Sequence, residues 1–168
     1  QKAPDAVASI AAMFRLKTAG WTEKKDAGKD ANDDAPKVNV YLPDNNLGGY
    51  CSYADTGNGI ITTDSPLVAY MRYTSDVLDL AVERAWPPEL REHPEDIRTQ
   101  NAAIIVPLNN GQELLGWLSL PGKHTNQPYS QSELNFLSAL ADQSLIGLER
   151  TNVMRRLEAR VAEQDQLS

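Results

Sequence analysis

Two apolar segments near the middle of the chain constrain its fold more than any other feature. Residues 102–108 (AAIIVPL) and 114–120 (LLGWLSL) are apolar at successive positions, so both faces of each strand need cover. The turn between them contains Asn110-Gly111, a dipeptide typical of β-hairpins. The sequence therefore predicts a buried hairpin in a sheet that other elements cover on both sides.

A helix is expected at each end of the chain. Residues 4–19 carry apolar side chains at helical spacing, and Gly20 is the expected stop. Near the other end, Ser130 and Glu133 have the spacing of a capping box, ahead of a helix expected over residues 131–164. At ~1.5 Å per residue this helix spans ~50 Å, more than the diameter of a small domain. Its C-terminal end must therefore leave the globule.

The projecting part of this helix has an apolar stripe of its own. Met154, Leu157 and Val161 follow one another at spacings of three and four residues. Such a stripe favours a partner helix, and a parallel coiled coil is the simplest arrangement. We therefore expect residues 1–150 to form the domain, residues 151–168 to begin a coiled-coil helix, and the chain to form a homodimer through its terminal helices. Because the chain begins with Gln rather than Met and this helix does not stop, we also expect one module of a longer protein.

The first half of the chain predicts shorter elements. Residues 22–37 carry charges of both signs and no large apolar side chain, which is typical of a flexible insertion. Asp64 or Ser65 is expected to cap a short helix with Pro66 in its first turn. Residues 74–101 predict either a short strand or a helical turn near their start, and a short helix after Pro87-Pro88. Three strands are expected, at residues 38–42, 49–53 and 60–62.

Composition excludes several classes of function. The net charge of −7 argues against nucleic acid as a partner, because phosphate binding needs clustered Lys and Arg. Cys51 is the one cysteine and His93 and His124 are the two histidines, so neither a disulfide framework nor a cysteine-rich zinc site is expected. No apolar run approaches ~20 residues and no signal peptide opens the chain. We therefore expect a cytoplasmic protein without membrane contact.

The second half of the chain resembles a GAF domain, the sensory module of many signalling proteins. The segments that carry the resemblance are Val106-Pro107-Leu108, Glu113 to Lys123, Pro128-Tyr129-Ser130 with Glu133, and Phe136 to Gln143. Upstream, Asp64 to Val68 and Pro87 to Leu90 resemble a bacterial subgroup found before histidine kinases or nucleotide cyclases. The resemblance implies an α+β fold, with a central antiparallel sheet and helices on both faces. One face would enclose a small-molecule pocket, and the first and last helices on the other would mediate dimerisation.

Aromatic side chains are the candidates for lining that pocket, because they combine an apolar body with a polar tip. The candidate residues are Tyr50, Tyr53, Tyr73, Trp86 and Trp117. The alternative is that they belong to the core, which we favour for Trp117 on its doubly covered strand. For Tyr73 and Trp86, in the loop-rich region where the family's pocket lies, both interpretations stay open.

The resemblance also identifies chemistry that the chain lacks. Members that attach bilin covalently carry a Cys-His pair, whereas Glu92 precedes His93 here, so covalent bilin is not expected and the cofactor stays unidentified. Lys123 and Glu133 match a family pair that braces a loop, although Glu133 as a simple helix cap is the favoured alternative. A reductase branch needs two cysteines, and Cys51 alone cannot close that cycle. No catalytic or metal-binding residue is therefore expected.

The leading hypothesis is a non-catalytic sensor of a signal-transduction protein, such as a two-component histidine kinase. It would bind an unidentified small ligand and relay the signal through its C-terminal helix. The alternative is a dimerisation and spacer module whose own side chains fill the pocket. An enzyme that uses Cys51 is the least favoured interpretation.

Overall fold

The computed structural model describes residues 4–22, 38–44, 46–52 and 60–167. Within these ranges, six antiparallel strands form one sheet in the order β3-β2-β1-β6-β5-β4. The strands are β1 (Asn39–Asp44), β2 (Gly49–Ser52), β3 (Ile60–Thr62), β4 (Leu78–Asp79), β5 (Ile104–Asn109) and β6 (Leu114–Leu120). The predicted hairpin of β5 and β6 therefore lies inside the sheet, with β1 on one side of it and β4 on the other.

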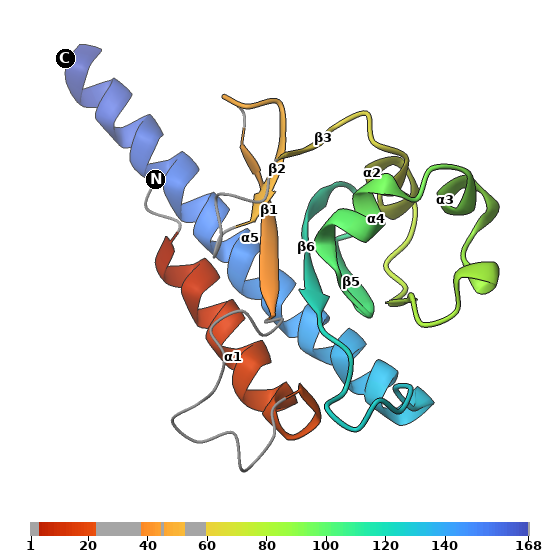
Figure 1. Ribbon diagram of the computed structural model, residues 1–168. Coiled ribbons are helices and arrows are strands. Elements are labelled where there is room, and N and C mark those ends of the chain that lie inside the picture. The colour runs from red at the N-terminus through yellow and green to blue at the C-terminus, as the bar shows by residue number, and fades with distance from the viewer. Residues whose placement is uncertain (1–3, 23–37, 45, 53–59, 168) are drawn as a thin grey trace, which may run out of the picture.

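Helices cover the sheet on both faces (Figure 1). Long helices α1 (Pro4–Thr22) and α5 (Gln131–Leu167) lie on one face. The other face carries α2 (Pro66–Met71), the short 3-10 helix η1 (Glu83–Ala85), α3 (Pro88–Glu92) and α4 (Glu95–Gln100). The expected α+β architecture is confirmed: a central antiparallel sheet has helices on both faces, and a long helix ends the described chain.

Alternation along the central strands divides the interior into two apolar clusters. Ile104 and Val106 face α1 and α5, while Ile105 between them faces α2, α3 and α4. All three side chains have no exposed surface. Successive residues of a strand point to opposite faces, so an unbroken apolar run is what a sheet covered on both sides requires.

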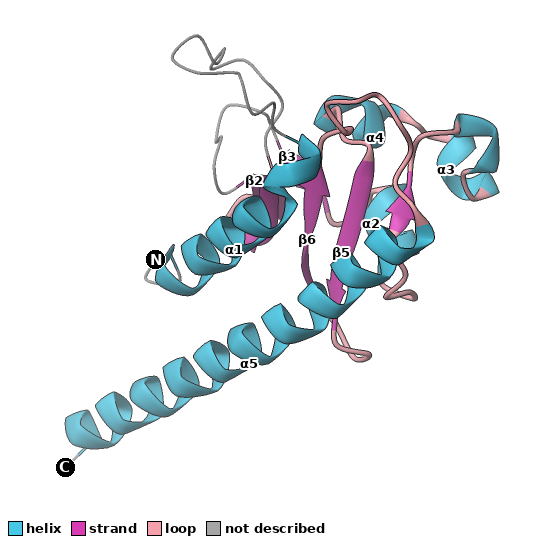
Figure 2. Ribbon diagram, turned by 90° about the horizontal axis from the view of Figure 1, so that it is seen from below, coloured by secondary structure: helices cyan, strands magenta, loops and turns pink. Residues whose placement is uncertain are grey.

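Helix α5 belongs to the domain only in its first half. Leu137, Leu140, Leu145 and Leu148 are buried in the cluster that also holds Phe14 of α1. Beyond these residues the helix continues without interruption and projects away from the body (Figure 2). A single uninterrupted helix therefore connects the core of the domain to a point outside it.

The helix caps follow the local signals in the sequence. The hydroxyl of Ser65 accepts a hydrogen bond from the Leu67 amide at 3.2 Å, so Ser65 rather than Asp64 caps α2. At the start of α5, Glu133 N donates to Ser130 Oγ at 3.2 Å, and Ser130 N donates to Glu133 Oε1 at 2.7 Å. Both halves of the predicted capping box are formed.

Helix α1 does not stop at Gly20, and that prediction is wrong. The helix ends at Thr22, whose hydroxyl donates to Thr18 O at 3.1 Å. Trp21 packs edge-on against Tyr129 and Phe136, with ring centroids 5.8 and 5.9 Å away. This packing extends the helix past a glycine, because tertiary contacts override a local stop signal of about 1 kcal/mol.

Candidate functional site

Three aromatic side chains, Tyr41, Tyr50 and Trp117, contact one another on the sheet face that carries α4. Tyr41 and Trp117 stack with centroids 5.1 Å apart and rings within 9° of parallel, and Tyr50 lies 4.9 Å from Trp117 at a tilt of 42°. Trp117 Nε1 donates to Gln100 Oε1 at the end of α4 at 2.8 Å. The Tyr50 hydroxyl donates to Leu114 O at 3.3 Å. Tyr50 and Trp117 are among the pocket residues predicted from the sequence, whereas Tyr41 is not.

These aromatic groups are packed against one another rather than spread around an open space. Trp117 has no exposed surface, and only 2% of Tyr41 and 6% of Tyr50 are exposed. Burial raises the pKa of Tyr50, with a smaller lowering contribution from the nearby Arg72 charge. The hydroxyl therefore stays protonated and acts as a hydrogen-bond donor over the whole physiological range.

The remaining candidates are placed differently. Trp86 belongs to the same apolar cluster, and its indole nitrogen donates to Leu80 O at 3.3 Å. Tyr73 lies in the turn after α2 with 90% of its surface exposed, so the structure does not bring it to the others. Tyr53 and residues 23–37 of the insertion expected over residues 22–37 lie outside the described residues.

Lys123 and Glu133 form an ion pair at the base of α5. Lys123 Nζ lies 2.6 Å from Glu133 Oε1, and the two side chains are only 13% and 17% exposed. The same oxygen accepts the capping hydrogen bond from the Ser130 amide. The brace and the cap were alternatives in the sequence, and the structure shows one carboxylate making both contacts.

The electrostatics of this pair follow from its contacts. Burial acts to raise the pKa of Glu133, but hydrogen bonds from Lys123 and Ser130 outweigh it, so the pKa lies below its usual value. The Lys123 ammonium also lies 5.5 Å from the centroid of the Tyr129 ring. Burial, followed by the Glu133 charge, raises the pKa of Tyr129 to about 12. The Tyr129 hydroxyl donates to Pro121 O at 2.7 Å, which ties the ring to the end of β6.

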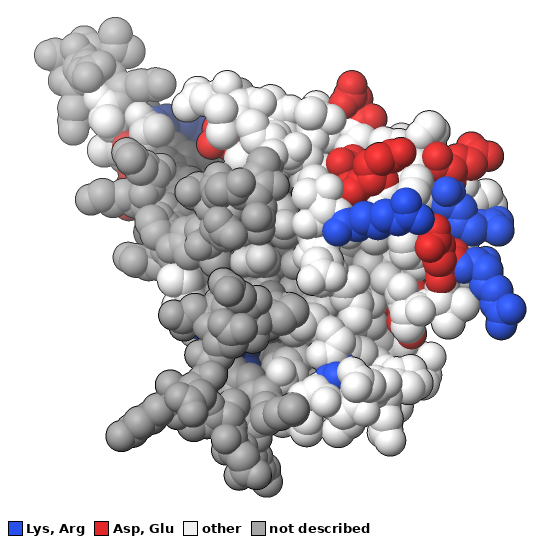
Figure 3. All heavy atoms as spheres, viewed as in Figure 1, with Lys and Arg blue, Asp and Glu red and all other residues white. Residues whose placement is uncertain are grey.

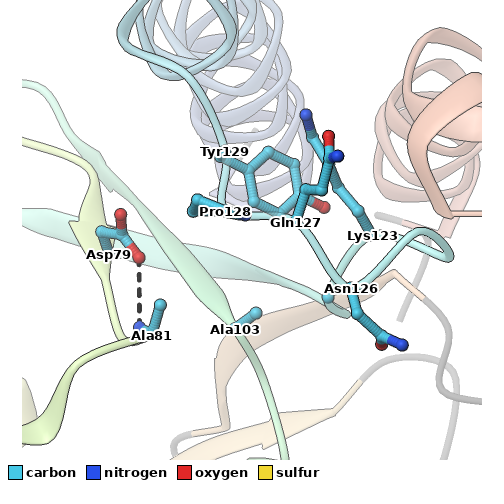
Figure 4. A pocket seen from close by; sticks show the side chains of 9 residues that line it. Asp79, Ala81, Ala103, Lys123, Asn126, Gln127, Pro128 and Tyr129 are labelled. Atoms are coloured by element: carbon cyan, nitrogen blue, oxygen red, sulfur yellow. Dashed lines mark hydrogen bonds between the residues drawn. The ribbon is translucent and has the colours of Figure 1, made fainter.

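A cavity of about 290 Å³ lies beside this pair (Figure 4). Asp79 and Ala81 form one side of it, the loop from β6 to α5 forms the other, and Ala103 lies between them. The lining residues are Asp79, Ala81, Ala103, Gly122, Lys123, Asn126, Gln127, Pro128 and Tyr129. The sequence predicts a role for Lys123 but not the cavity. Its walls come from three segments that lie far apart along the chain, the nearest two at Ala103 and Gly122, and no local spacing indicates that they meet.

The candidate groups for catalysis and metal binding are dispersed. In the described ranges, no three His, Cys, Asp or Glu side chains gather as a metal ion would require. Cys51 is half-buried on β2, and burial, with a contribution from Asp44, raises the pKa of its thiol. A raised pKa disfavours the thiolate, the form that acts as a nucleophile.

The surface of the molecule differs between its two ends. Of the predicted dimer residues, Leu157 and Val161 expose 51% and 57% of their surface, and the side chain of Met154 lies outside the described part of the chain. Around α3 and η1, basic and acidic side chains are interleaved (Figure 3), as in the exposed pair of Arg98 and Glu83 at 2.9 Å. No described helix is both long and apolar enough to cross a bilayer.

Comparison with known proteins agrees with the fold described above. The family model of the GAF domain matches residues 17–148. A crystal structure of residues 122 to 287 of a methyl-accepting chemotaxis protein superposes with a TM-score of 0.55 at 15% identity, covering 92% of this chain and 98% of that one. A GAF domain/HD domain protein from Geobacter sulfurreducens gives 0.59 at 14% identity over 90% and 95% of the two chains.

A third structure, the second GAF domain of DevS from Mycobacterium smegmatis, gives a TM-score of 0.55 at 13% identity over 91% of this chain and 97% of that one. At these identities the likeness shows the fold alone. A comparison with curated proteins finds no match.

Proposed function

The chain belongs to the GAF domain family, and on that premise we propose that it is a non-catalytic sensory and regulatory module of a signal-transduction protein. The observation that carries the proposal is the continuity of α5. Its first half is buried in the core of the domain, and its second half leaves the body as the same helix. Any event that shifts the core on the α5 face changes the position of the projecting end.

The contacts at the base of α5 support transmission of such a shift. Glu133 holds both Lys123 and the Ser130 amide, and Tyr129 is hydrogen-bonded to the end of β6. Trp21 packs on Tyr129, so α1 is joined to the same point. A helix moves as a unit when its end is held by charge-assisted hydrogen bonds and aromatic packing, rather than fraying from its first turn.

We propose that two copies of the module associate in the cytoplasm through their terminal helices. Leu157 and Val161 lie one turn apart on the projecting half of α5, and both are more than half exposed. Pairing two such stripes removes apolar surface from water and holds the two output ends together. An attached histidine kinase or nucleotide cyclase would then respond to their relative position.

The signal is proposed to be a small ligand bound on the face of α2, α3 and α4. Titration calorimetry of the 168-residue chain against a metabolite panel tests this proposal. Saturable binding that Trp117→Phe weakens supports it, because this substitution keeps an aromatic ring and removes the hydrogen bond to Gln100. Leu16→Ala, at a side chain 75% exposed on α1, is the matched control and should leave the affinity unchanged.

The alternative is a spacer module without a ligand, and one observation favours it. Tyr41, Tyr50 and Trp117 already fill the interior that the described residues enclose there. Absence of binding across the panel, together with a stable dimer, would favour the spacer module over the sensor. A monomer at all concentrations would contradict both proposals.

A further inference from the structure

The cavity beside the base of α5 lies apart from the aromatic groups considered above. Its walls belong to the edge strand β4, to the residue before β5 and to the loop from β6 to α5. None of its nine lining residues is among the five aromatic candidates. Its volume, about 290 Å³, is close to the lower limit of roughly 300–1,000 Å³ for small-molecule sites.

The charges around the cavity favour a cation. Asp79 and Lys123 are the two charged residues that line it. The Lys123 charge is compensated by Glu133 at 2.6 Å, whereas Asp79 makes no ion pair among the described residues. Asp79 Oδ1 accepts a hydrogen bond from the Ala81 amide at 3.1 Å, and its second oxygen has no partner in the same part of the chain. One carboxylate oxygen is therefore available to a charged donor.

The other walls supply polar and apolar contacts. Asn126 and Gln127 carry amides that bond to no other described side chain, and Asn126 has a left-handed backbone with φ of 61°. Asparagine adopts this conformation more readily than most residues, so the turn holds Asn126 without strain. Pro128 and the fixed ring of Tyr129 form an apolar wall opposite Asp79.

We propose that this cavity binds a small organic cation that carries an ammonium or guanidinium group. Its charged nitrogen donates to the free Asp79 oxygen, and its aliphatic part lies along Pro128 and Tyr129. Because Lys123 and Tyr129 also hold α5, an occupant contacts the base of the relay helix directly. That link to α5 rests on the proposed function, whereas binding itself does not.

The test uses the 168-residue chain and agmatine, which carries both an amine and a guanidinium group. Backbone NMR shifts of Ala81, Gly122 and Asn126 are followed up to about 10 mM agmatine, a range that detects dissociation constants near 1 mM. Asp79→Asn keeps the acceptor for the Ala81 amide and removes only the charge. It should weaken binding about tenfold, since hydrogen bonds to charged groups are the stronger ones.

Asp76→Asn is the matched control, because Asp76 is an exposed carboxylate three residues before Asp79 in the chain and does not line the cavity. It should leave the affinity within about twofold of the parent chain. Succinate, an anion of similar size, should produce no saturable shifts.

Three results overturn the proposal: no saturable shifts with agmatine, equal weakening by both substitutions, or equal binding of succinate. Binding of agmatine without any response of α5 would leave the site in place and contradict only the relay in the proposed function.

Discussion

Gly116 shows how a single residue sets the geometry of the sheet. It lies in β6 opposite Leu108, next to a register irregularity, and its φ of +145° is a conformation that residues with side chains rarely adopt. A Cβ built there would lie 2.2 Å from Tyr41 O of β1. Because that neighbour is backbone, it cannot rotate away. The close approach of β1 and β6 next to the Tyr41–Trp117 stack therefore depends on a missing side chain.

Gly116→Ala should destabilise the domain by at least about 2 kcal/mol, through backbone strain and collision with Tyr41 O. Gly147→Ala is the control: it lies in α5, and a Cβ there would meet nothing within 4 Å. That change should stabilise the helix by up to about 1 kcal/mol, because alanine is the better helix former. Urea denaturation of both variants measures the difference. Equal stabilities would contradict the described approach of β1 and β6.

Glu133 gives the ion pair a defined pH dependence. Its pKa in the folded chain lies below the usual value of 4.5, so the carboxylate stabilises the fold above that pH. The contribution is lost as pH falls through the lowered pKa. Glu133→Gln should therefore cost about 1 kcal/mol at pH 7, and the difference from the parent chain should shrink under acid conditions.

Denaturation curves at neutral and acid pH test this expectation. Glu158→Gln, at an exposed position of α5, serves as the control and should change stability little at either pH. A cost of Glu133→Gln that stays constant with pH would show that the ionised form is not what braces the loop.

The elements differ in how well the sequence predicts them. The β5–β6 hairpin, the Ser65 cap and the capping box follow from residues that are neighbours in the chain. The sequence does not predict helix α4. Five of its six residues are polar and Ile97 is its one buried side chain, so the segment shows no helical periodicity. Its place is fixed by distant partners: Gln100 accepts from Trp117, and Asp96 accepts from Ser65 at 2.5 Å.

Helix α5 is the element through which we propose that the chain self-associates. Replacing Leu157 and Val161 together by asparagine should weaken self-association at least about tenfold, because each buried aliphatic side chain contributes roughly 1.5–3 kcal/mol. Analytical ultracentrifugation measures the dissociation constant. The control replaces Glu158 and Arg160 by glutamine, on the same exposed turn of the helix. Equal association of the two double variants would exclude this stripe as the interface.

At the scale of the whole molecule, the two faces of the sheet carry different helices. On one face α1 and α5 pack together, and α5 continues beyond the domain. The α2–α4 face carries the stacked aromatic residues. The doubly apolar hairpin predicts cover on both faces of the sheet, and the family resemblance implies that the first and last helices share one of them. The sequence does not predict the cavity, because Asp79, Ala103 and Tyr129 meet only after β4, β5 and the β6–α5 loop have come together. Periodicity reports which side of an element is buried, whereas a cavity depends on how several elements fit.

In the proposed function, the domain acts on its output through α5. Pulsed EPR tests it on a dimer labelled through Glu158→Cys in a Cys51→Ser background, with and without the ligand identified by calorimetry. Saturating ligand should change the distance between the two labels by about 1–2 Å or more, in line with helix shifts in other switching proteins. Identical distance distributions in the two states would contradict it.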